Sequence, residues 1–386
     1  MISCEYLIIG AGFAGAATAY HLTRRGVKDL VLLEQEAIPG FHSSGRNAAM
    51  IRQCVSDPAL AELTRDGAAF LCHFPSDWPV PVKLKQNGSL LLGSGEGWER
   101  LRRDAELGRS LGVDAVLWTP EQAKRHVPVL QQAEFDGAVW CASDGVIDIH
   151  ALLTGYLAAA AGKGMRIRYR AAVRAVCTTD DGGLEVTTDG ETIKTKVLIN
   201  AGGAWVNRIA KMAGANELPL RPCRRHLFVS PPLNWVDASW PFVWDVSHDL
   251  YFRPEGDGLL LCACDQVELP PGDPPVDGAV QELLAEKIQR WMPGLSDVAI
   301  SRGWAGFRTL SADGRFVIGW DPKVKGFFWV AGLGGHGVTT SSAVGALAAE
   351  LIAGGAGKKS DAFAPARFSL GDLTSVPKDR AVDEAP

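Results

Sequence analysis

The stretch YLIIGAGFAGAATAYHLTRRG, residues 6–26, decides the fold class. An apolar run precedes its glycines and an alanine-rich run follows them, which predicts a buried strand, a tight turn and a helix. Gly10 permits the turn, Gly12 lets a pyrophosphate approach the backbone, and Gly15 lets the helix pack on the strand. The N-terminus of the helix then directs unpaired N–H groups at the phosphates.

A second apolar run, LVLLE at residues 30–34, ends on an acidic residue. Glu34 lies 24 residues after Gly10, where a carboxylate would bind ribose hydroxyls. Strand, turn, helix, second strand and acidic end occur in the required order. The sequence therefore predicts a dinucleotide site rather than a glycine-rich turn alone, without choosing between NAD and FAD.

The same pattern occurs twice more. Residues 196–214 (KVLINAGGAWVNRIAKMAG) and 326–355 both lead from an apolar strand through small residues into a helix. Either segment alone is typical of an ordinary tight turn. Together with the first, they indicate three strand ends around one crevice, and the glycines at 332–337 indicate a flat ligand lying against main chain.

Between these segments the composition changes to strands and turns without alternating helices, except for an amphipathic helix at about 279–291. We therefore expect an α/β protein, in which a Rossmann-type dinucleotide-binding domain carries an inserted, mostly antiparallel-sheet substrate domain. The strands expected in the insertion lie at 82–95, 223–230, 250–264 and 298–308. The expected division is 1–80, 140–215 and 306–370 for the first domain, 81–139 and 216–305 for the second, and 371–386 for a tail.

The bulk composition excludes several functions. A net charge of −5 leaves no basic footprint for nucleic acid. The chain has no uncharged apolar run of membrane-spanning length, and its start, MISCEYLIIGAG, has no basic region, so we expect a core strand there rather than a signal peptide. The eight cysteines form no CxxC pair and no cluster with histidine, which favours reduced thiols in a cytoplasmic protein and gives no indication of a metal site. A peripheral contact with the inner membrane stays open.

Several further motifs carry a resemblance that covers nearly the whole chain. They are HSSGRNAA at 42–49, DGVIDIHALLTGYLAAA at 144–160, NAGGAW at 200–205, GFRTLSADGRFVIG at 306–319 and GGHG at 334–337. With the first glycine motif and Glu34, this order resembles the flavin-dependent family of D-amino-acid oxidase, glycine oxidase, monomeric sarcosine oxidase and bacterial D-amino-acid dehydrogenases. Within it, the chain looks most like D-arginine dehydrogenase. The resemblance implies FAD, bound non-covalently because 306–312 has no cysteine for attachment.

In that family the segment after the ribose carboxylate crosses beneath the flavin. Small residues such as Ser44, Gly45 and Ala48 would allow close packing, and Arg46 and Asn47 would donate hydrogen bonds to the pyrophosphate or ring edge. An ordinary loop with solvated arginines is the alternative. The expected cofactor-binding residues are Gly10, Gly12, Gly15, Glu34, Ser44, Arg46, Asn47, Ala48, Val173, Ala201, Gly202, Trp205, Gly334, Gly335, Gly337, Val338 and Thr339.

The resemblance also places the substrate carboxylate on Arg225 and Arg308, with Tyr251 beside them. A planar guanidinium matches a carboxylate bidentately, and an arginine within an apolar strand needs an anion. A salt-bridged arginine or a core tyrosine is the alternative at each position. His336, in the last glycine loop, is a candidate for tuning the protonation of the substrate amine, unless its partner is main chain.

Departures from the D-arginine enzyme concern the substrate side chain. Met50 and Val55 stand where it has a histidine and a tyrosine, and the region of Asn87 lacks its glutamate, which disfavours a strongly cationic substrate. We expect Arg52 and His226 to project into the pocket instead and to favour an anionic or polar side chain. A surface position for Arg52 is the alternative.

The leading interpretation is an enzyme that oxidises the C–N bond of a D-amino acid or N-alkyl amino acid. Hydride would pass from Cα to flavin N5, and the imine would hydrolyse to a 2-keto acid. Oxidation of a 2-hydroxy acid, a flavin-carrying subunit of a larger complex, and an NAD-dependent dehydrogenase are the alternatives. The sequence leaves open the side chain, the stereochemistry, the oligomeric state and the electron acceptor, which could be oxygen, a quinone or another carrier.

Overall fold

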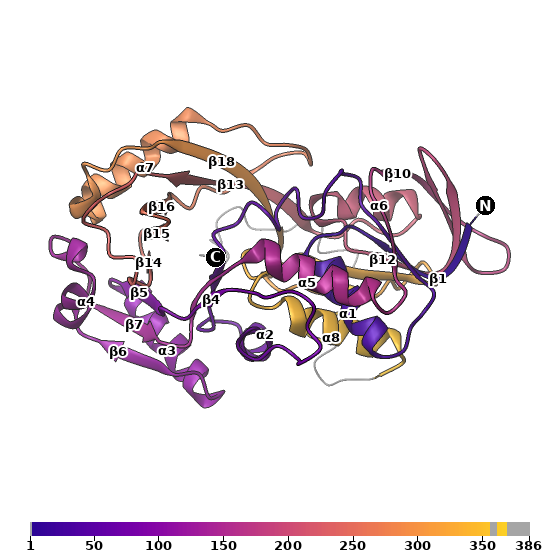
Figure 1. The fold of residues 1–386 in the computed structure, drawn as a ribbon, viewed down its shortest axis with the longest axis horizontal. Helices are drawn as coiled ribbons and strands as arrows, with labels where there is room; N and C mark the ends of the chain where they lie inside the picture. Colours follow the sequence, from indigo (N-terminus) through magenta and orange to yellow (C-terminus); the bar gives the residue numbers. More distant parts are fainter. Residues whose placement is uncertain (1, 356–360, 369–386) are drawn as a thin grey trace.

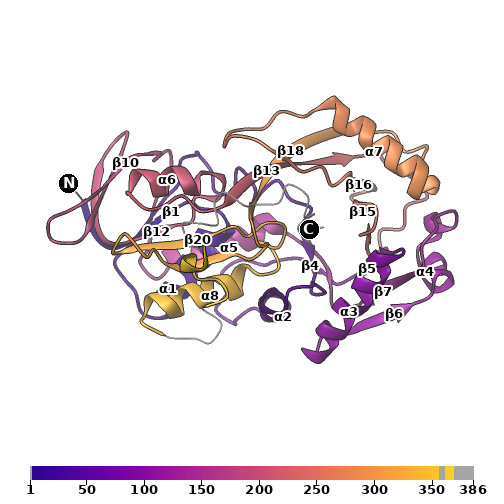
Figure 2. The same cartoon turned by 180° about the vertical axis from the view of Figure 1, so that it is seen from behind.

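The computed structural model describes residues 2–355 and 361–368 and consists of two lobes side by side (Figure 1). One lobe contains β1, α1 and α8, and the other contains β5, β7 and α7. The reverse view in Figure 2 shows the same division. The tail expected at 371–386 lies outside the described residues.

The first lobe is built on an eight-stranded sheet in the order β10-β11-β12-β1-β2-β9, with β20 on β12 and β19 on β20. Its centre is parallel, since β1 pairs with β2 and β12, and β12 pairs with β20, all in the same direction. Their carboxyl ends therefore meet at one edge. The strands are β1 (Ile2–Ile9), β2 (Leu30–Leu33), β9 (Arg166–Arg168), β10 (Val173–Thr178), β11 (Leu184–Thr188), β12 (Thr192–Asn200), β19 (Val317–Trp320) and β20 (Phe327–Ala331).

Helices α1 (Phe13–Arg24), α5 (Ile149–Ala161) and α8 (Ser341–Ile352) pack together on one face of this sheet (Figure 1). Helices α1 and α8 approach backbone to backbone, because a Cβ added at Gly345 would overlap the main chain of Ala17. This contact explains why both helices are rich in alanine and glycine rather than in large apolar residues. Helix α6 (Val206–Met212) packs against the second core on the sheet.

The second lobe is built on a nine-stranded sheet in the order β17-β13-β16-β15-β14-β5-β7-β6, with β18 on β13. It is antiparallel except for the pair β5 and β14, as the sequence predicts for the substrate domain. The strands are β5 (Ser89–Gly93), β6 (Ala115–Trp118), β7 (Gly137–Cys141), β13 (Leu220–Val229), β14 (Phe242–Asp245), β15 (Leu250–Glu255), β16 (Gly258–Cys262), β17 (Val267–Glu268) and β18 (Arg302–Ser311).

Each face of this sheet has its own partners. Helix α7 (Gly278–Trp291), close to the bounds expected for it, packs on the face that carries Phe228 and Phe252. The opposite face carries Tyr251 and packs against Ala48 of the loop after β2. Adjacent residues of one strand thus face either α7 or the other lobe.

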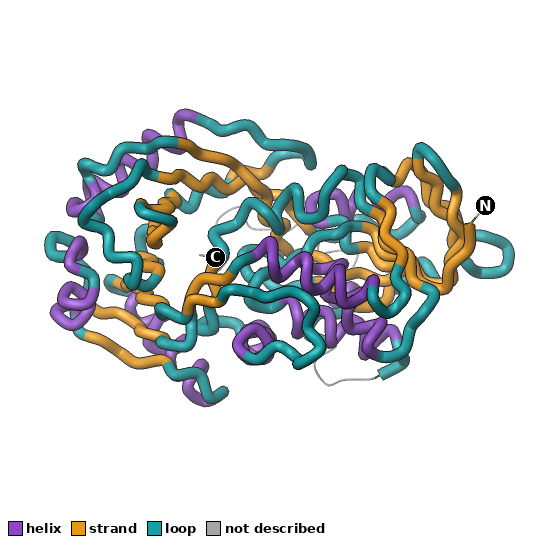
Figure 3. The backbone as a smooth tube through the Cα atoms, in the orientation of Figure 1, coloured by secondary structure: helices purple, strands orange, loops and turns teal. Residues whose placement is uncertain are grey.

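A small sheet connects the lobes, and Figure 3 shows how strands and loops alternate there. It consists of β3 (Met50–Ile51), β4 (Leu84–Lys85) and β8 (Gly145–Ile147). The strand expected at 82–95 is therefore two strands, β4 and β5, which belong to different sheets. The remaining helices are α2 (Pro58–Cys72), α3 (Glu96–Ser110) and α4 (Pro120–His126).

Two of the expected domain boundaries cut through strands. Residue 140 lies within β7 and residue 306 lies within β18, and both strands belong wholly to the nine-stranded sheet. Pairing with neighbouring strands holds each as one unit, so we propose that the divisions fall after residues 141 and 311 instead. Within the described ranges, no helix combines the length and apolar character needed to cross a membrane. All eight cysteines are free thiols.

The packing of α1 on α8 includes a half-buried histidine whose protonation opposes folding. His21 Nε2 lies 3.0 Å from Ser342 Oγ, and burial together with the charges of Arg24 and Arg25 lowers the pKa of His21 from 6.5 to about 4. The unfolded chain therefore binds a proton that the folded chain resists. This loss of stability begins as the pH falls below 6.5 and is complete below about 4.

We expect His21→Gln to remove most of this acid sensitivity. A shift of this size corresponds to about 3 kcal/mol between pH 7 and pH 4, at 1.36 kcal/mol per pKa unit. Urea unfolding at several pH values would show a smaller acid-induced fall in the free energy of unfolding for His21→Gln than for the wild type. The exposed His73→Gln variant serves as the control. An equal fall in wild type and His21→Gln would contradict the prediction.

Candidate active site

The carboxyl ends of β1 and β12 meet in direct backbone contact. Gly10 has φ +105°, and a Cβ there would overlap the carbonyl oxygen of Ala201. A Cβ at Gly15 would in turn overlap the carbonyl oxygen of Gly10. The Ala201 N–H donates to Ile9 O at 3.0 Å and fixes the two strand ends together. The turn therefore requires glycine at both positions.

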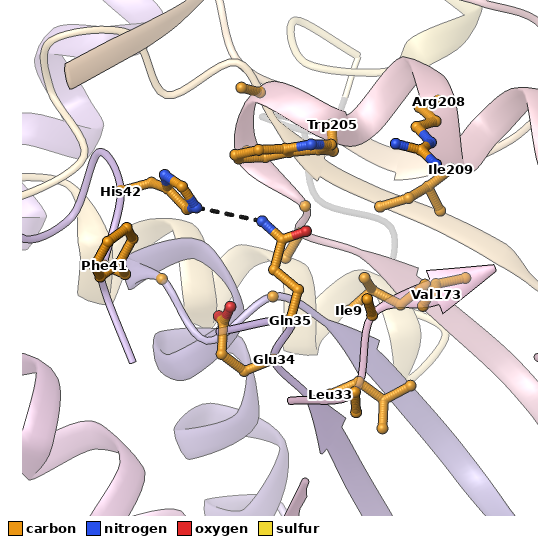
Figure 4. Close-up of a pocket in the computed structure, with 18 of the residues that line it drawn as sticks. Ile9, Leu33, Glu34, Gln35, Phe41, His42, Val173, Trp205, Arg208 and Ile209 are labelled. Carbon is orange, nitrogen blue, oxygen red and sulfur yellow. Dashed lines mark hydrogen bonds between the residues drawn. The ribbon is translucent and has the colours of Figure 1, made fainter. Parts of the chain in front are cut away.

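A cleft begins at this edge, and Figure 4 shows its first half. Apolar side chains from three strands form its walls: Ile9, Leu33 and Val173. Glu34 follows β2, and its carboxylate accepts hydrogen bonds from the N–H groups of Ala11 and Glu36, both at 2.9 Å. Burial raises the pKa of Glu34. The combination of apolar walls and a positioned carboxylate suits an adenine and its ribose.

Sequence reasoning assigned no role to His42, which also lines this half. Its ring lies 4.6 Å from that of Trp205, and its Nε2 lies 2.9 Å from Glu36 Oε1 and 3.3 Å from the Gln35 amide (Figure 4). Arg208 also lines the cleft and was not expected there. In the sequence, only the position of His42 just after the acidic strand end could indicate that it lines the cleft. Its ring contact could not be predicted, because it involves Trp205, far along the chain.

The second half of the cleft continues from the first without a break. Both halves are lined by Gly12, Ser43, Ser44, Ala201 and Gly203. The far wall includes part of the glycine loop after β20, namely Gly332, Gly334, Gly335, Gly337 and Val338. One extended ligand could therefore contact all three strand ends, as the repeated strand–glycine–helix pattern predicts. Gly202 lines the first half, whereas Thr339 lines neither and accepts a hydrogen bond from the Arg52 N–H at 3.1 Å.

The segment 42–49 crosses the second half, but its polar side chains are already bonded within the protein. Ser44 Oγ accepts from the Phe13 N–H at 3.0 Å at the start of α1. Asn47 donates to the carbonyls of Ser43 and Ser44 and accepts from the Ala49 N–H at 2.8 Å. Asn47 thus organises the loop around Ala49, which has φ +60°.

Arg46 is engaged in the same way. Its guanidinium forms an ion pair with Asp273, donates to the carbonyl of Ala305 at 3.2 Å, and lies over the Phe41 ring. The expected donation from Arg46 and Asn47 to the cofactor thus competes with bonds that the structure shows to protein groups. Both residues still line the cleft, as does the buried Ala48.

Three expected substrate residues come together on one face of the nine-stranded sheet. Arg225 (β13), Arg308 (β18) and Tyr251 (β15) all line the second half of the cleft. Arg308 pairs with Cys223, two residues before Arg225, so both arginines point to the same side. Tyr251 is fully buried and Arg225 is 5% exposed. Arg308 is half-buried, and all three residues stand in the wall of the cleft.

Several polar atoms of this trio lack hydrogen-bond partners among the described residues. Buried atoms without a hydrogen bond are Arg225 Nε and Nη1, Arg308 Nη1 and the Tyr251 hydroxyl. Arg225 Nη2 alone donates, to Gln266 Oε1 at 3.2 Å. Leaving a buried charge unpaired costs several kcal/mol. An anion in the cleft would supply the missing acceptors.

Met50, Arg52 and His336 lie at the edge of this region. Met50 lines the cleft, whereas Arg52 and His336 line an adjoining cavity together with Val55. Burial and the positive charges of Arg52 and Arg308 hold the pKa of His336 well below 6.5. His336 is therefore neutral at physiological pH.

The expectation that His226 projects into the pocket is not met. Its neighbour Arg225 faces the cleft, so His226 points to the other face of β13, towards α7. There its Nδ1 donates to Asp265 at 2.7 Å, its Nε2 accepts from the Asp277 N–H at 3.0 Å, and its ring stacks on Phe228. It has a structural role in the sheet.

Asn87 also lies away from the cleft. Asn87 lies in the loop before β5, and its amide donates to the carbonyl of Trp240. It lines neither the cleft nor the adjoining cavity. Its place in the fold gives it no route to a substrate side chain.

Comparison with known proteins identifies the family. The model described as "FAD dependent oxidoreductase" matches residues 5–351. The chain belongs to this family. It is 25% identical over 396 residues to the FAD-dependent oxidoreductase domain-containing protein 1 of Xenopus laevis, a match that covers 91% of the chain and 79% of that protein.

Two further relatives are informative. The crystal structure of L-proline dehydrogenase from P. horikoshii superposes with a TM-score of 0.87 and 26% identity, covering 96% of this chain and 99% of that one. Mouse mitochondrial sarcosine dehydrogenase is 24% identical over 379 residues, covering 92% of this chain but only 40% of that longer protein. The cofactor of this chain is thus FAD, and the chain is an oxidoreductase.

The residues present fit FAD along the whole cleft. Glu34 and the apolar walls near Val173 could hold the adenosine end, and the N-terminus of α1 behind Gly12 could face the pyrophosphate. Gly334 and Gly335 line the other end of the cleft without side chains, which leaves room for a flat ring. The trio of unpaired donors lies at this flavin end.

We expect Gly10→Ala to abolish FAD binding, since the new Cβ overlaps Ala201 and separates the strand ends. Gly26→Ala is the matched control, because Gly26 also has a positive φ (+91°) but nothing lies within 4 Å of its added Cβ. The control should lose only about 1 kcal/mol of stability through backbone strain and keep its flavin. Absorbance of the desalted proteins near the flavin band gives the cofactor content. Equal flavin retention in the two variants would refute the assignment.

Proposed function

We propose that this enzyme oxidises the C–N bond of an α-amino acid, either of D configuration or N-alkylated, to an imine that hydrolyses to a 2-keto acid. The observation that carries the proposal is the set of unpaired donors on Arg225, Arg308 and Tyr251 at the flavin end of the cleft. These groups suit a carboxylate, because they offer positive charge and several hydrogen-bond donors.

The two arginines and the tyrosine would fix the substrate by its carboxylate. A guanidinium fork binds two carboxylate oxygens at once, and the second arginine and the phenol would restrict rotation. Because all three project from paired strands, they are positioned before the substrate arrives, and little ordering cost remains on binding. The Cα–H is then directed at the neighbouring ring site.

The same wall would keep the substrate amine neutral. FAD, when bound, supplies the acceptor of the hydride. The buried arginines raise the positive potential, which disfavours an ammonium group, and His336 adds no charge because burial keeps it neutral. The apolar Leu227, two residues from Arg225 on the same face of β13, also lines the cleft and would exclude water from the reacting face.

The relatives support an amine rather than another substrate. Sarcosine and proline are both amino acids with a secondary amine, which favours the N-alkyl alternative. The D configuration and the likeness to D-arginine dehydrogenase remain predictions, as do non-covalent attachment of FAD and a cytoplasmic location. The electron acceptor stays open between oxygen, a quinone and another carrier. The carboxylate site alone would accept a 2-hydroxy acid equally well, so the reaction must be tested directly.

The decisive experiment is an anaerobic titration of the holoenzyme with matched D-, L- and N-methyl amino acids and 2-hydroxy acids. Bleaching of the flavin band by an amino acid, with release of a 2-keto acid and an amine or ammonia, is the expected result. Bleaching only by 2-hydroxy acids would contradict amino acid oxidation and indicate that 2-hydroxy acids are the substrates. Flavin that no compound bleaches would contradict the proposal and favour a subunit of a larger complex.

Replacing Arg308 tests the carboxylate site. We expect Arg308→Met to lower kcat/KM for the best amino acid by roughly 100-fold, the size of a lost charge-assisted hydrogen bond in the transition state. Arg308→Lys should recover part of this loss, since the charge remains without the fork. The corresponding amino acid amide should be a poor substrate for all three enzymes. If the variants discriminated between acid and amide as the wild type does, Arg308 would not bind the carboxylate.

The pH dependence tests the role of His336. Activity should rise with pH as the substrate amine loses its proton, and its midpoint should move with the amine pKa when an N-methyl substrate replaces the primary amine. His336→Gln should leave the midpoint in place, because the pKa of His336 lies well below this range. The midpoint is measured from steady-state kcat/KM as a function of pH. A midpoint that moves in the variant would show that His336 itself titrates.

A further inference from the structure

Arg52 is a third arginine near the substrate trio, and it is buried. Its exposed fraction is only 9%, and its guanidinium lies over the Trp244 ring at 5.1 Å. Arg52 Nε is buried without a partner, and in the described ranges no hydrogen bond or ion pair reaches its guanidinium. Burial lowers the pKa of Arg52 to about 10, so it stays charged at neutral pH.

The acidic residues nearest to Arg52 have other partners. Asp144 accepts hydrogen bonds from Ser89 Oγ at 2.6 Å and from the Gln53 amide at 3.0 Å. Asp104 accepts from Ser56 Oγ at 3.0 Å. Neither is within ion-pair distance of Arg52, although both act on its charge from further away.

The other carboxylates that line the adjoining cavity form ion pairs with arginines. Arg52 and His336 form part of the wall of this cavity of about 250 Å³. Of its remaining carboxylates, Asp57 pairs with Arg315 and Asp313 pairs with Arg367, both at 2.7 Å. Arg52 is thus left without a counter-ion in contact.

Arg52 is also close to the substrate trio. Trp244 lies under its guanidinium, and the Trp244 ring lies 4.8 Å from the Tyr251 ring. Each step is about 5 Å, so the Arg52 guanidinium lies within about 10 Å of the Tyr251 ring. The charge of Arg308 also acts on Arg52. One small molecule could reach both positions.

We propose that Arg52 binds a second carboxylate, so that the substrates are dicarboxylic amino acids. This inference rests on the proposed function, because it extends the substrate of the same site. One α-carboxylate accounts for Arg225 and Arg308 but leaves Arg52 unpaired. The second carboxylate ends either the side chain or a carboxyalkyl group on the amine. His336, which lines the same cavity and is neutral, adds no second positive charge beside Arg52.

Binding without turnover tests Arg52 independently of the reaction. The holoenzyme is titrated with succinate and with succinamate, its monoamide of the same shape, and the change in the flavin spectrum is followed. Succinate should bind roughly 10- to 100-fold more tightly, the range of a charge-assisted hydrogen bond. Arg52→Met should remove this preference, and Arg52→Lys should keep part of it. Arg102→Met, which removes the same charge from the exposed face of α3, should not alter it.

Equal affinity of the wild type for succinate and succinamate would overturn the inference, whether or not amino acids are oxidised, and this comparison needs no variant. A preference that survives in Arg52→Met with unchanged flavin content would also overturn it. If succinate binds in an Arg52-dependent way but no amino acid bleaches the flavin, the proposed function fails and the dicarboxylate site stands.

Turnover then distinguishes the two forms of the substrate. Aspartate and glutamate are compared with asparagine and glutamine, and iminodiacetate with sarcosine, as kcat/KM ratios. If kcat/KM for aspartate or glutamate exceeds that for asparagine or glutamine by more than tenfold, the second carboxylate belongs to the side chain. If kcat/KM for iminodiacetate exceeds that for sarcosine by more than tenfold, it belongs to the amine substituent. Arg52→Met should lower that ratio through KM. Ratios near one in both sets would overturn the dicarboxylate assignment.

Discussion

The contact between the β1 turn and the end of β12 is the constraint on which the rest of the structure depends. Gly10 can lie against the Ala201 carbonyl only because it has no Cβ and adopts a positive φ. This approach sets the spacing of the parallel strands at their carboxyl edge. Because β20 pairs with β12 on the far side, the glycine loop after β20 is placed on the same edge. The strand ends that line the cofactor cleft are thus brought together at one edge.

The sequence predicts those features that depend on local chemistry and on strand order. The glycine turn, Glu34 and the three strand ends could all be found, because their roles follow from backbone freedom and from the direction of parallel strands. The antiparallel lobe was predictable from its alternating strands, although the split of 82–95 into β4 and β5 was not. That split depends on pairing with β8, which lies some 60 residues further along.

The error at His226 has a simple physical origin. Arg225 and His226 are adjacent in β13, so they cannot both face the cleft, and the two-residue period of a strand could have excluded His226. Asn47 instead shows a limit of sequence reasoning. Its bonds to Ser43, Ser44 and Ala49 depend on the shape of a loop that no periodicity describes. The lack of partners for Arg225 and Arg308 likewise becomes visible only once every neighbour is placed.

The continuous pairing of β13 with β18 has a mechanical consequence. Ten residue pairs, from Leu220–Ser311 to Val229–Arg302, join the cofactor lobe to the far sheet without interruption (Figure 1). Arg225 and Arg308 lie on this ribbon, and Leu220 at its end packs close to Gly332 of the glycine loop. The two chain segments that lead from one lobe to the other here are held together by the ladder, so a rotation between the lobes would have to bend both of them together. The ladder thus favours a fixed distance between the two arginines and the glycine loop that lines the flavin end of the cleft.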